Sequence, residues 1–278
     1  MRVAVTGASG FLGRHVMRAL RGRGATLIAI SRHPEAPLDD SVTPVAFDIA
    51  DADDSTFDRI GRPDILLHLA WGGLPNYHSL HHLERELPMH SMFLGSCIRA
   101  GLRRLVVAGT CLEYGMQSGE LIETMPAAPA TAYAEAKQAL HRHLSALQDE
   151  YGFGLGWLRL FYLYGPGQAP TSLFPQLRAA IESGASSFDM SRGDQIRDFL
   201  AVETAADHIA ALTLDHRNAA VVNVCSGRPV TVVDMAQTWL REWGADITLN
   251  RGARPYPDYE PFAFWGNPGR LHDMLQTI

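Results

Sequence analysis

The sequence predicts an α/β fold: a doubly wound parallel sheet with a smaller C-terminal lobe. Apolar, strand-like runs alternate with helical runs through the first two-thirds of the 278 residues. Repeated strand–helix units place parallel strands in one sheet that helices cover on both faces. After Gly165-Pro166-Gly167 the helices become shorter and Pro/Gly turns more frequent. We therefore expect one domain over residues 1–164 and, over residues 165–278, mostly a second lobe with chain crossings back to the first.

The strand candidates are short and rich in β-branched and aliphatic residues, and the helix candidates show apolar residues at helical spacing. The expected strands are Arg2–Thr6, Thr26–Ser31, Val45–Phe47, Asp64–Ala70, Arg104–Ala108 and Gly156–Phe161. The expected helices lie near residues 10–22, 53–60, 79–100 and 132–151. Pro88 falls inside the third of these helices, so we expect a kink or break there.

A glycine-rich turn joins the first strand to the first helix. Gly7, Gly10 and Gly13 are spaced at i, i+3 and i+6, and Phe11 and Leu12 open an apolar helix. In such a turn the first glycine allows the sharp bend and the second lets the backbone approach a pyrophosphate. The third lets the helix, whose N-terminus faces the anion, pack on the sheet. The turn predicts a Rossmann-type dinucleotide site over residues 1–164.

The end of the second strand distinguishes between dinucleotides. A site for NAD usually carries Asp or Glu there, whereas this chain has Ser31 and Arg32. A hydroxyl and a guanidinium suit a 2′-phosphate, so NADP(H) is favoured and NAD(H) remains possible; otherwise Arg32 is a solvated loop residue. Asp48-Ile49 follows the third strand, where a carboxylate could meet the adenine amino group.

Three polar residues are candidates for the chemistry. Tyr133 and Lys137 are one turn apart on the same face of a predicted helix. A free tyrosine, with a pKa near 10, is poorly suited to proton transfer at neutral pH, and a nearby ammonium lowers that pKa. Thr110 lies just beyond the Arg104–Ala108 strand, at the sheet edge where open α/β sheets bind ligands.

Composition restricts the partners and the compartment. The net charge of -6 argues against nucleic acid or an anionic membrane surface as a partner, and no apolar run reaches membrane-spanning length. Three widely spaced cysteines suggest a reducing compartment, without zinc spacing or a disulfide framework. Met1 leads directly into the first strand, so we expect no signal peptide and a cytoplasmic protein.

Motifs along nearly the whole chain resemble the extended short-chain dehydrogenases/reductases of the NAD-dependent epimerase/dehydratase family, which act on nucleotide sugars. The motifs are Thr6–Gly13, Asp48-Ile49, His68-Leu69-Ala70, Gly109–Gly115, Tyr133–Lys137, Arg159–Gly167, Gln195–Phe199 and Val222–Gly227. The resemblance implies that Leu69 and Ala70 contact the cofactor. It gives Thr110 the substrate-oxygen contact, Tyr133 the proton transfer, and Lys137 the nicotinamide ribose and the tuning of Tyr133.

The resemblance also implies a substrate site. Arg197 and Arg254 match arginines that grip a nucleotide diphosphate, and the remaining candidates for substrate contact are Trp71, Cys111, Leu112 and Tyr162. Tyr162 stands where many relatives have Asn, and Glu86 stands near the place of a family asparagine. Dehydratase relatives carry an Asp-Glu pair where this chain has Cys111-Leu112, so a 4,6-dehydratase is not expected.

The resemblance favours an NAD(P)H-dependent reductase of a 4-keto-6-deoxy nucleotide sugar, nearest to dTDP-4-dehydro-6-deoxyglucose reductases. The alternatives are a nucleotide-sugar 4-epimerase with tightly bound NAD and a non-catalytic NADP-sensing regulator. The family often forms homodimers through a four-helix bundle, so we expect a homodimer through the helices at 79–100 and 132–151; those faces would equally suit packing within one subunit.

Some candidate residues have structural alternatives. Trp71 either stacks on a sugar or base or covers core, and Cys111 either faces substrate or fills a buried space. His78, His81, His82 and His90 cluster near one helix. Without a visible acidic partner, they predict a solvated or interface role and no metal.

Overall fold

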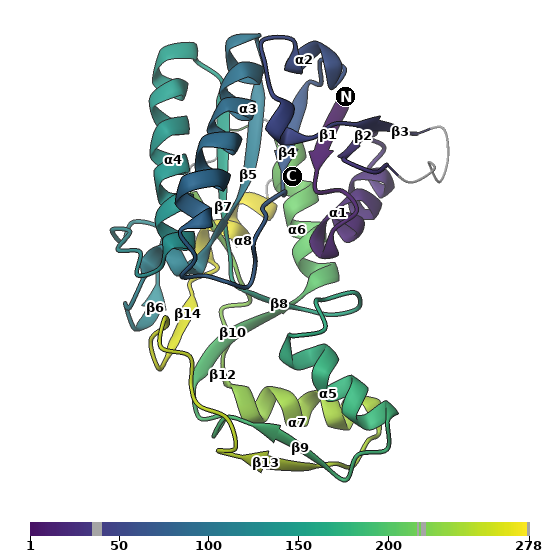
Figure 1. Cartoon of the computed structure of the whole chain (residues 1–278), viewed down its shortest axis with the longest axis vertical. Coiled ribbons are helices and arrows are strands. Elements are labelled where there is room, and N and C mark those ends of the chain that lie inside the picture. The colour runs from purple at the N-terminus through teal and green to yellow at the C-terminus, as the bar shows by residue number, and fades with distance from the viewer. Residues whose placement is uncertain (35–40, 216, 218–220, 277–278) are drawn as a thin grey trace.

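The computed structural model describes residues 1–34, 41–215, 217 and 221–276. In this part of the chain the largest sheet has seven parallel strands in the order β11-β7-β5-β4-β1-β2-β3 (Figure 1). Its strands are β1 (Arg2–Thr6), β2 (Thr26–Ser31), β3 (Val42–Ala46), β4 (Ile65–His68), β5 (Arg104–Thr110), β7 (Gly154–Leu160) and β11 (Val221–Val224). The predicted Rossmann-type fold is confirmed.

Helices cover both faces of this sheet, because side chains along each strand alternate between two apolar cores. Val3 and Val5 belong to one core, and Ala4 between them belongs to the other. The first core lies under α1 (Phe11–Gly22), α6 (Val202–Leu214) and α8 (Gly269–Leu275). The second lies under α2 (Thr56–Arg59), α3 (Leu87–Arg99) and α4 (Ala132–Tyr151).

A smaller lobe lies below the carboxyl edge of the sheet in Figure 1. Its own apolar core joins α5 (Leu173–Glu182), β9 (Ser187–Met190), α7 (Val232–Trp243) and β13 (Thr248–Arg251). Between the lobes lie the sheet of β12 (Pro229–Thr231), β10 (Ile196–Ala201) and β8 (Tyr162–Tyr164), and the pair β14 (Phe264–Gly266) and β6 (Gly119–Leu121). The chain crosses back after residue 165, since α6, β11 and α8 pack with the large sheet.

The expected third helix changes its hydrogen-bonding pattern next to Pro88. A π-helical turn, η2 (His82–Glu86), precedes α3, and Pro88 lies in the first turn of α3. Proline cannot donate a backbone hydrogen bond, so it is tolerated in a first helical turn and not within a continuous helix. The helical conformation continues through Glu86 and Leu87, so the hydrogen-bonding pattern changes from π- to α-helical next to Pro88 without a break in the helix, and Glu86 ends the π-helical turn.

Four of the six predicted strands differ from the structure in their bounds, and the third differs most. The predicted Val45–Phe47 is observed as β3 (Val42–Ala46), which begins earlier and includes Pro44. Pro44 is tolerated because β3 is the outermost strand of the sheet and pairs on one side only.

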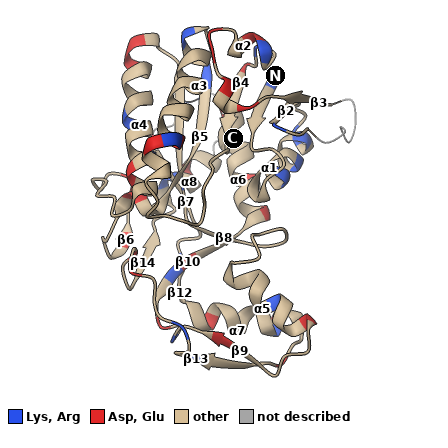
Figure 2. Cartoon of the chain, in the orientation of Figure 1, with Lys and Arg blue, Asp and Glu red and all other residues tan. Residues whose placement is uncertain are grey.

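Residues of both charge signs are spread along the chain, and the arginines of α1 stand out in Figure 2. Helices α3 and α4 pack against each other within the subunit, while Met92 on α3 is 58% exposed. The homodimer stays a prediction. Among the described residues, no helix combines the length and the apolar character needed to cross a bilayer.

Candidate active site

The carboxyl ends of the parallel strands bring the candidate residues to one edge of the sheet. β1 pairs with β2 on one side and with β4 on the other, so the strand order reverses direction at β1. Ligands of open α/β sheets bind at such a switch point, outside the carboxyl ends of the strands. The turn after β1 and the loop after β4 therefore form the two sides of the predicted dinucleotide site.

The glycine turn after β1 leaves space that side chains would fill. Gly7 has a φ of +69°, and a Cβ there would lie 3.0 Å from the Ala70 nitrogen. A Cβ on Gly13 would overlap the Gly7 carbonyl oxygen and lie 2.9 Å from Ala8 atoms. Gly10 is the N-cap of α1. It has no side chain that would cap the free N–H groups of the first helical turn and keep an anion away from them. This backbone-lined cradle at a helix N-terminus fits a dinucleotide pyrophosphate.

An arginine that the sequence reasoning missed lies beside the cradle. Arg14, one turn into α1, places its Nε 3.3 Å from the Gly10 carbonyl oxygen. The available signal in the sequence was a basic residue four positions after Gly10. A guanidinium here supplies positive charge next to the predicted phosphate position.

The other predicted cofactor residues lie at the same edge. Phe11 and Leu12 form the first turn of α1, and Ser31 ends β2 with Arg32 exposed just beyond it. Two further pairs, Asp48-Ile49 and Leu69-Ala70, follow β3 and β4. The Asp48 carboxylate caps the 3-10 turn η1 (Ile49–Asp51) by accepting from the Ala50 N–H at 3.0 Å. Asp48 therefore has a structural contact as well as its predicted adenine contact.

The three predicted catalytic residues come together from β5 and α4. Thr110 ends β5, and Tyr133 and Lys137 lie in the first two turns of α4, whose N-cap is Thr131. The exposed fractions of Thr110, Tyr133 and Lys137 are 7%, 8% and 2%. The Lys137 Nζ donates to the Ala108 carbonyl oxygen at 2.9 Å and lies 6.0 Å from the centre of the Tyr133 ring.

Burial sets the electrostatics of this group. Burial lowers the pKa of Lys137 to about 7, although the nearby Glu113 and Glu86 carboxylates raise it. Burial also raises the pKa of Tyr133, which a hydrogen bond from Thr110 opposes. The sequence reasoning expected Lys137 to lower the pKa of Tyr133. In the structure without a cofactor, removal of water from the phenol outweighs such an effect, because burial disfavours the charged form.

The acidic residue nearest to Thr110 has a structural role. Glu113 lies in the 3-10 turn η3 (Cys111–Tyr114) and forms a capping box with Thr110. Its carboxylate accepts from the Arg159 Nε at 2.8 Å and from the Trp157 indole at 3.0 Å. Because Glu113 is fully buried and all these contacts are internal, it is not placed to exchange protons with a substrate.

Three of the predicted substrate residues lie beside this group. Leu112 packs in a small apolar cluster with Tyr133, and Trp71 and Tyr77 pack against it. Cys111 is buried in another cluster with Tyr114 and Phe161. Cys111 therefore fills a buried space beside Thr110, and Trp71 covers core from a partly buried position. Substrate contacts of these residues stay predictions.

The two predicted diphosphate arginines lie in different surroundings. Arg197 is 1% exposed, and its guanidinium donates to Glu260 at 2.6 Å and to the carbonyl oxygens of Ile196 and Phe262. Glu260 also accepts from the Tyr162 hydroxyl. The guanidinium of Arg197 is thus paired with an internal carboxylate, and its contact with a diphosphate stays a prediction. Arg254 is exposed and contacts Gln176 on α5 at 3.3 Å.

Residues that the sequence reasoning missed come from proline-flanked loops. Tyr77 follows Leu74-Pro75, and its ring lies 5.6 Å from that of Tyr133 and 5.0 Å from that of Tyr259. Tyr259 and Glu260 precede Pro261 in the C-terminal lobe. The available signal for them in the sequence was the presence of tyrosines in loops close to prolines. The contacts link the two lobes beside Tyr133.

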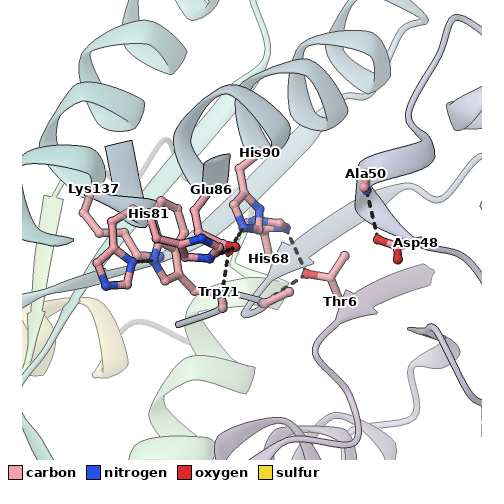
Figure 3. Close-up of polar contacts among 12 residues, drawn as sticks. Thr6, Asp48, Ala50, His68, Trp71, His81, Glu86, His90 and Lys137 are labelled. Atoms are coloured by element: carbon pink, nitrogen blue, oxygen red, sulfur yellow. Dashed lines mark hydrogen bonds and ion pairs between the residues drawn. The ribbon is translucent and has the colours of Figure 1, made fainter. Parts of the chain in front are cut away.

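Two of the four clustered histidines differ from their prediction. His82 and His90 are 0% and 1% exposed, so they are not solvated, and Glu86 is the acidic partner that the sequence did not reveal. Figure 3 shows Glu86 meeting His81 and His90, with Nε2–carboxylate distances of 2.9 and 3.1 Å. Among the described residues, no group of three or more His, Cys, Asp or Glu side chains is placed to hold a metal.

Comparisons with known proteins agree with this geometry. The chain is 26% identical over 272 residues to the dTDP-6-deoxy-L-talose 4-dehydrogenase (NAD(+)) of Aggregatibacter actinomycetemcomitans, covering 96% of this chain and 99% of that protein. It is 27% identical to the UDP-glucose 4-epimerase of Azospirillum brasilense, covering 85% and 76% of the two chains.

Solved structures show the same fold. The UDP-glucuronic acid 4-epimerase of Bacillus cereus, in complex with UDP-glucuronic acid and NAD, superposes with a TM-score of 0.85 at 21% identity, covering 99% of this chain and 93% of that one. The model of the NAD dependent epimerase/dehydratase family matches residues 3–225. With its Rossmann-type sheet, glycine cradle and Thr110–Tyr133–Lys137 group, the chain belongs to this family of NAD-dependent enzymes, of the extended short-chain dehydrogenase/reductase type.

Proposed function

We propose that the protein reduces the 4-keto group of a 4-keto-6-deoxy nucleotide sugar with NAD(P)H. One observation carries the proposal: Thr110, Tyr133 and Lys137 gather at the carboxyl edge of the sheet, the edge that also holds the glycine cradle, while the neighbouring carboxylate of Glu113 is tied into the core. A keto reduction needs one proton donor and a hydride, and no second acid/base pair. The relative that matches 96% of this chain is named as a dTDP-sugar 4-dehydrogenase, and such an enzyme catalyses the same exchange in the opposite direction.

The residues divide the reaction between them. A bound nicotinamide supplies the hydride that forms the new C–H bond at the keto carbon. The carbonyl π electrons move to its oxygen, which takes the phenolic proton of Tyr133, while Thr110 donates a hydrogen bond to the same oxygen. Lys137 stabilises the phenolate that remains until solvent reprotonates it. The products are an alcohol at C4 and NAD(P)⁺, so electrons and protons balance.

We further propose that NADPH is preferred to NADH. The support is the pair Ser31-Arg32 at the carboxyl end of β2, where Arg32 is exposed and no carboxylate occupies the position. A guanidinium attracts a 2′-phosphate that a carboxylate would repel. A relative from Kitasatospora kifunensis, 25% identical, is named as a dTDP-6-deoxy-L-talose 4-dehydrogenase (NAD(P)(+)).

The test is a panel of keto sugars. Purified protein is mixed with NADPH or NADH and with dTDP- or UDP-linked 4-keto-6-deoxyhexoses, and nicotinamide absorbance is followed. We expect oxidation of the reduced cofactor with at least one sugar and a 4-hydroxy product by NMR. If the cofactor stays reduced with every sugar of the panel, the proposal is wrong.

A second candidate is a nucleotide-sugar 4-epimerase, which the 27% identity to the Azospirillum brasilense enzyme favours. An epimerase oxidises and re-reduces C4 with the same three residues and therefore retains its NAD. Denaturing the purified protein and quantifying released nucleotide separates the two functions. About one NAD per chain would support the epimerase, and a cofactor-free protein that consumes NADPH would support the reductase.

A further inference from the structure

A buried network of polar side chains adjoins the catalytic group and is absent from the mechanism above. It begins at Glu86, the last residue of the π-helical turn before α3. Although burial raises the pKa of Glu86, hydrogen bonds from His90 and from the Gly72 backbone lower it to about 2. Glu86 is thus an ionised carboxylate with 4% exposure. A buried charge of this kind requires partners that are held in place.

A chain of hydrogen bonds connects Glu86 to β1 through two histidines. His90 donates from Nε2 to Glu86 at 3.1 Å, so its Nδ1 is free to accept from the Nε2 of His68 at 2.8 Å. The His68 Nδ1 then accepts from the Thr6 hydroxyl at 2.9 Å. Burial lowers the pKa of both histidines, which fits neutral rings with one donor and one acceptor each. These hydrogen bonds end at Thr6, the last residue of β1, directly before the glycine cradle.

The same carboxylate positions Trp71. The Gly72 N–H donates to Glu86 at 2.7 Å, which fixes the backbone directly after Trp71. The indole stacks on the His90 ring with centroids 4.6 Å apart and planes 8° apart. Its N–H donates to the Nδ1 of His82 at 3.1 Å. The indole is therefore held on one face by His90, which donates to Glu86, and at its edge by His82.

The indole of Trp71 also meets Lys137. The Lys137 Nζ lies 3.9 Å from the centre of a Trp71 ring, within the range of a cation–π contact (Figure 3). An indole face attracts an ammonium and does not attract a neutral amine, so the contact favours the protonated form. Ionisable groups also surround Lys137 from several elements: Glu86 and His82 (η2), His90 (α3), His68 (β4), Glu113 (η3) and Tyr133 (α4).

We propose that Glu86 is a positioning residue for Lys137: it holds Trp71 as a cation–π platform and supplies counter-charge, so that Lys137 keeps its ammonium beside Tyr133. The proposal rests on the role of Lys137 in the proposed function. It explains why a carboxylate with two histidine partners lies next to a buried lysine. It predicts that Glu86 and Trp71 influence the protonation of Lys137 even when no substrate is present.

The sequence makes the test unusually direct, because Lys137 is the only lysine in the chain. Protein grown with [13Cε]lysine gives one lysine signal, whose shift against pH reports the protonation of Lys137 in the cofactor-free chain. We expect Glu86→Gln and Trp71→Leu to lower the titration midpoint by about half a pH unit or more. Trp71→Phe, which keeps a smaller aromatic face, should lie between Trp71→Leu and the unchanged chain.

Glu84→Gln is the matched control, since Glu84 lies on the same π-helical turn and is exposed; its midpoint should equal that of the unchanged chain. Circular dichroism verifies the folding of each variant. If Glu86→Gln does not fold, the variants of Trp71, which is partly exposed, provide the test. A midpoint that stays or rises in the folded variants would overturn the proposal. No sugar is needed, so failure of the reductase assay with an intact midpoint shift would overturn the proposed function alone.

Discussion

Glu113 and Arg159 form an ion pair inside the protein, with Oε2 and Nε 2.8 Å apart and side chains 0% and 4% exposed. The pair joins the turn after β5 to the neighbouring strand β7. It therefore connects the backbone around Thr110 to the neighbouring strand of the sheet. Removing one partner leaves the other charge buried without compensation, which costs about 3–5 kcal/mol.

We therefore expect Glu113→Gln to lower the free energy of unfolding by about that amount, measured by urea denaturation. The double variant Glu113→Gln with Arg159→Met removes both charges and should recover part of the loss. Glu120→Gln, at an exposed position on β6, is the control and should change stability little. Equal stability of Glu113→Gln and Glu120→Gln would contradict the structural role of the pair.

Gly13→Ala should disrupt the dinucleotide cradle. The added Cβ overlaps the Gly7 carbonyl oxygen, so α1 must move away from the turn that holds it. We expect binding of NADPH, followed by quenching of protein fluorescence, to weaken by about tenfold or more. Gly22→Ala is the control, because a Cβ at the end of α1 meets nothing within 4 Å. Equal cofactor affinity in both variants would contradict the cradle.

Tyr133→Phe removes the proposed proton donor and keeps the ring that packs on Leu112. We expect kcat for keto-sugar reduction to fall by about 10²–10⁴-fold, while the dissociation constant of NADPH changes little. Tyr151→Phe, at the exposed far end of the same helix, should keep the original rate. A Tyr133→Phe variant with full activity would show that another group delivers the proton.

Lys137 should make stability depend on pH. Burial lowers its pKa from 10.5 to about 7, so between these values the unfolded chain binds more protons and stability rises with pH. Below about 7 both states carry the ammonium and the full cost of burying it remains. Lys137→Met removes this cost, so we expect the variant to exceed the original chain by a few kcal/mol at pH 6.

This difference should shrink as pH rises from about 7 to 10, and thermal unfolding at several pH values measures it. Arg142→Met, at an exposed position on the same helix, provides the comparison for loss of one positive charge. A stability difference that is constant over this pH range would show that Lys137 titrates alike in the folded and unfolded chain.

Arg32→Ala should discriminate between the two dinucleotides. Loss of the guanidinium removes the proposed partner of a 2′-phosphate, so we expect NADPH affinity to fall by about tenfold and NADH affinity to change little. Isothermal titration with each cofactor measures both. Arg59→Ala, on α2, is an exposed control. Equal losses for NADPH and NADH would remove the support for an NADP preference.

Local patterns in the sequence determined the fold class. Short continuous apolar runs predicted the strands, because each strand sends successive side chains into two opposite apolar cores. The glycine spacing predicted the turn after β1, where steric overlap alone excludes a Cβ at residue 13. Tyr133 and Lys137 were found because helical spacing brings i and i+4 to one face, and that geometry is local.

Tertiary structure alone decided what surrounds these residues. Glu86 reaches Gly72, and Arg197 is paired with Glu260, which lies 63 residues further along the chain. Neither contact follows from spacing in the sequence, since only the packing of helices on the sheet brings the partners together. Burial acts in the same way: it lowers the pKa of Lys137 and raises that of Tyr133 because the assembled lobes exclude water from both.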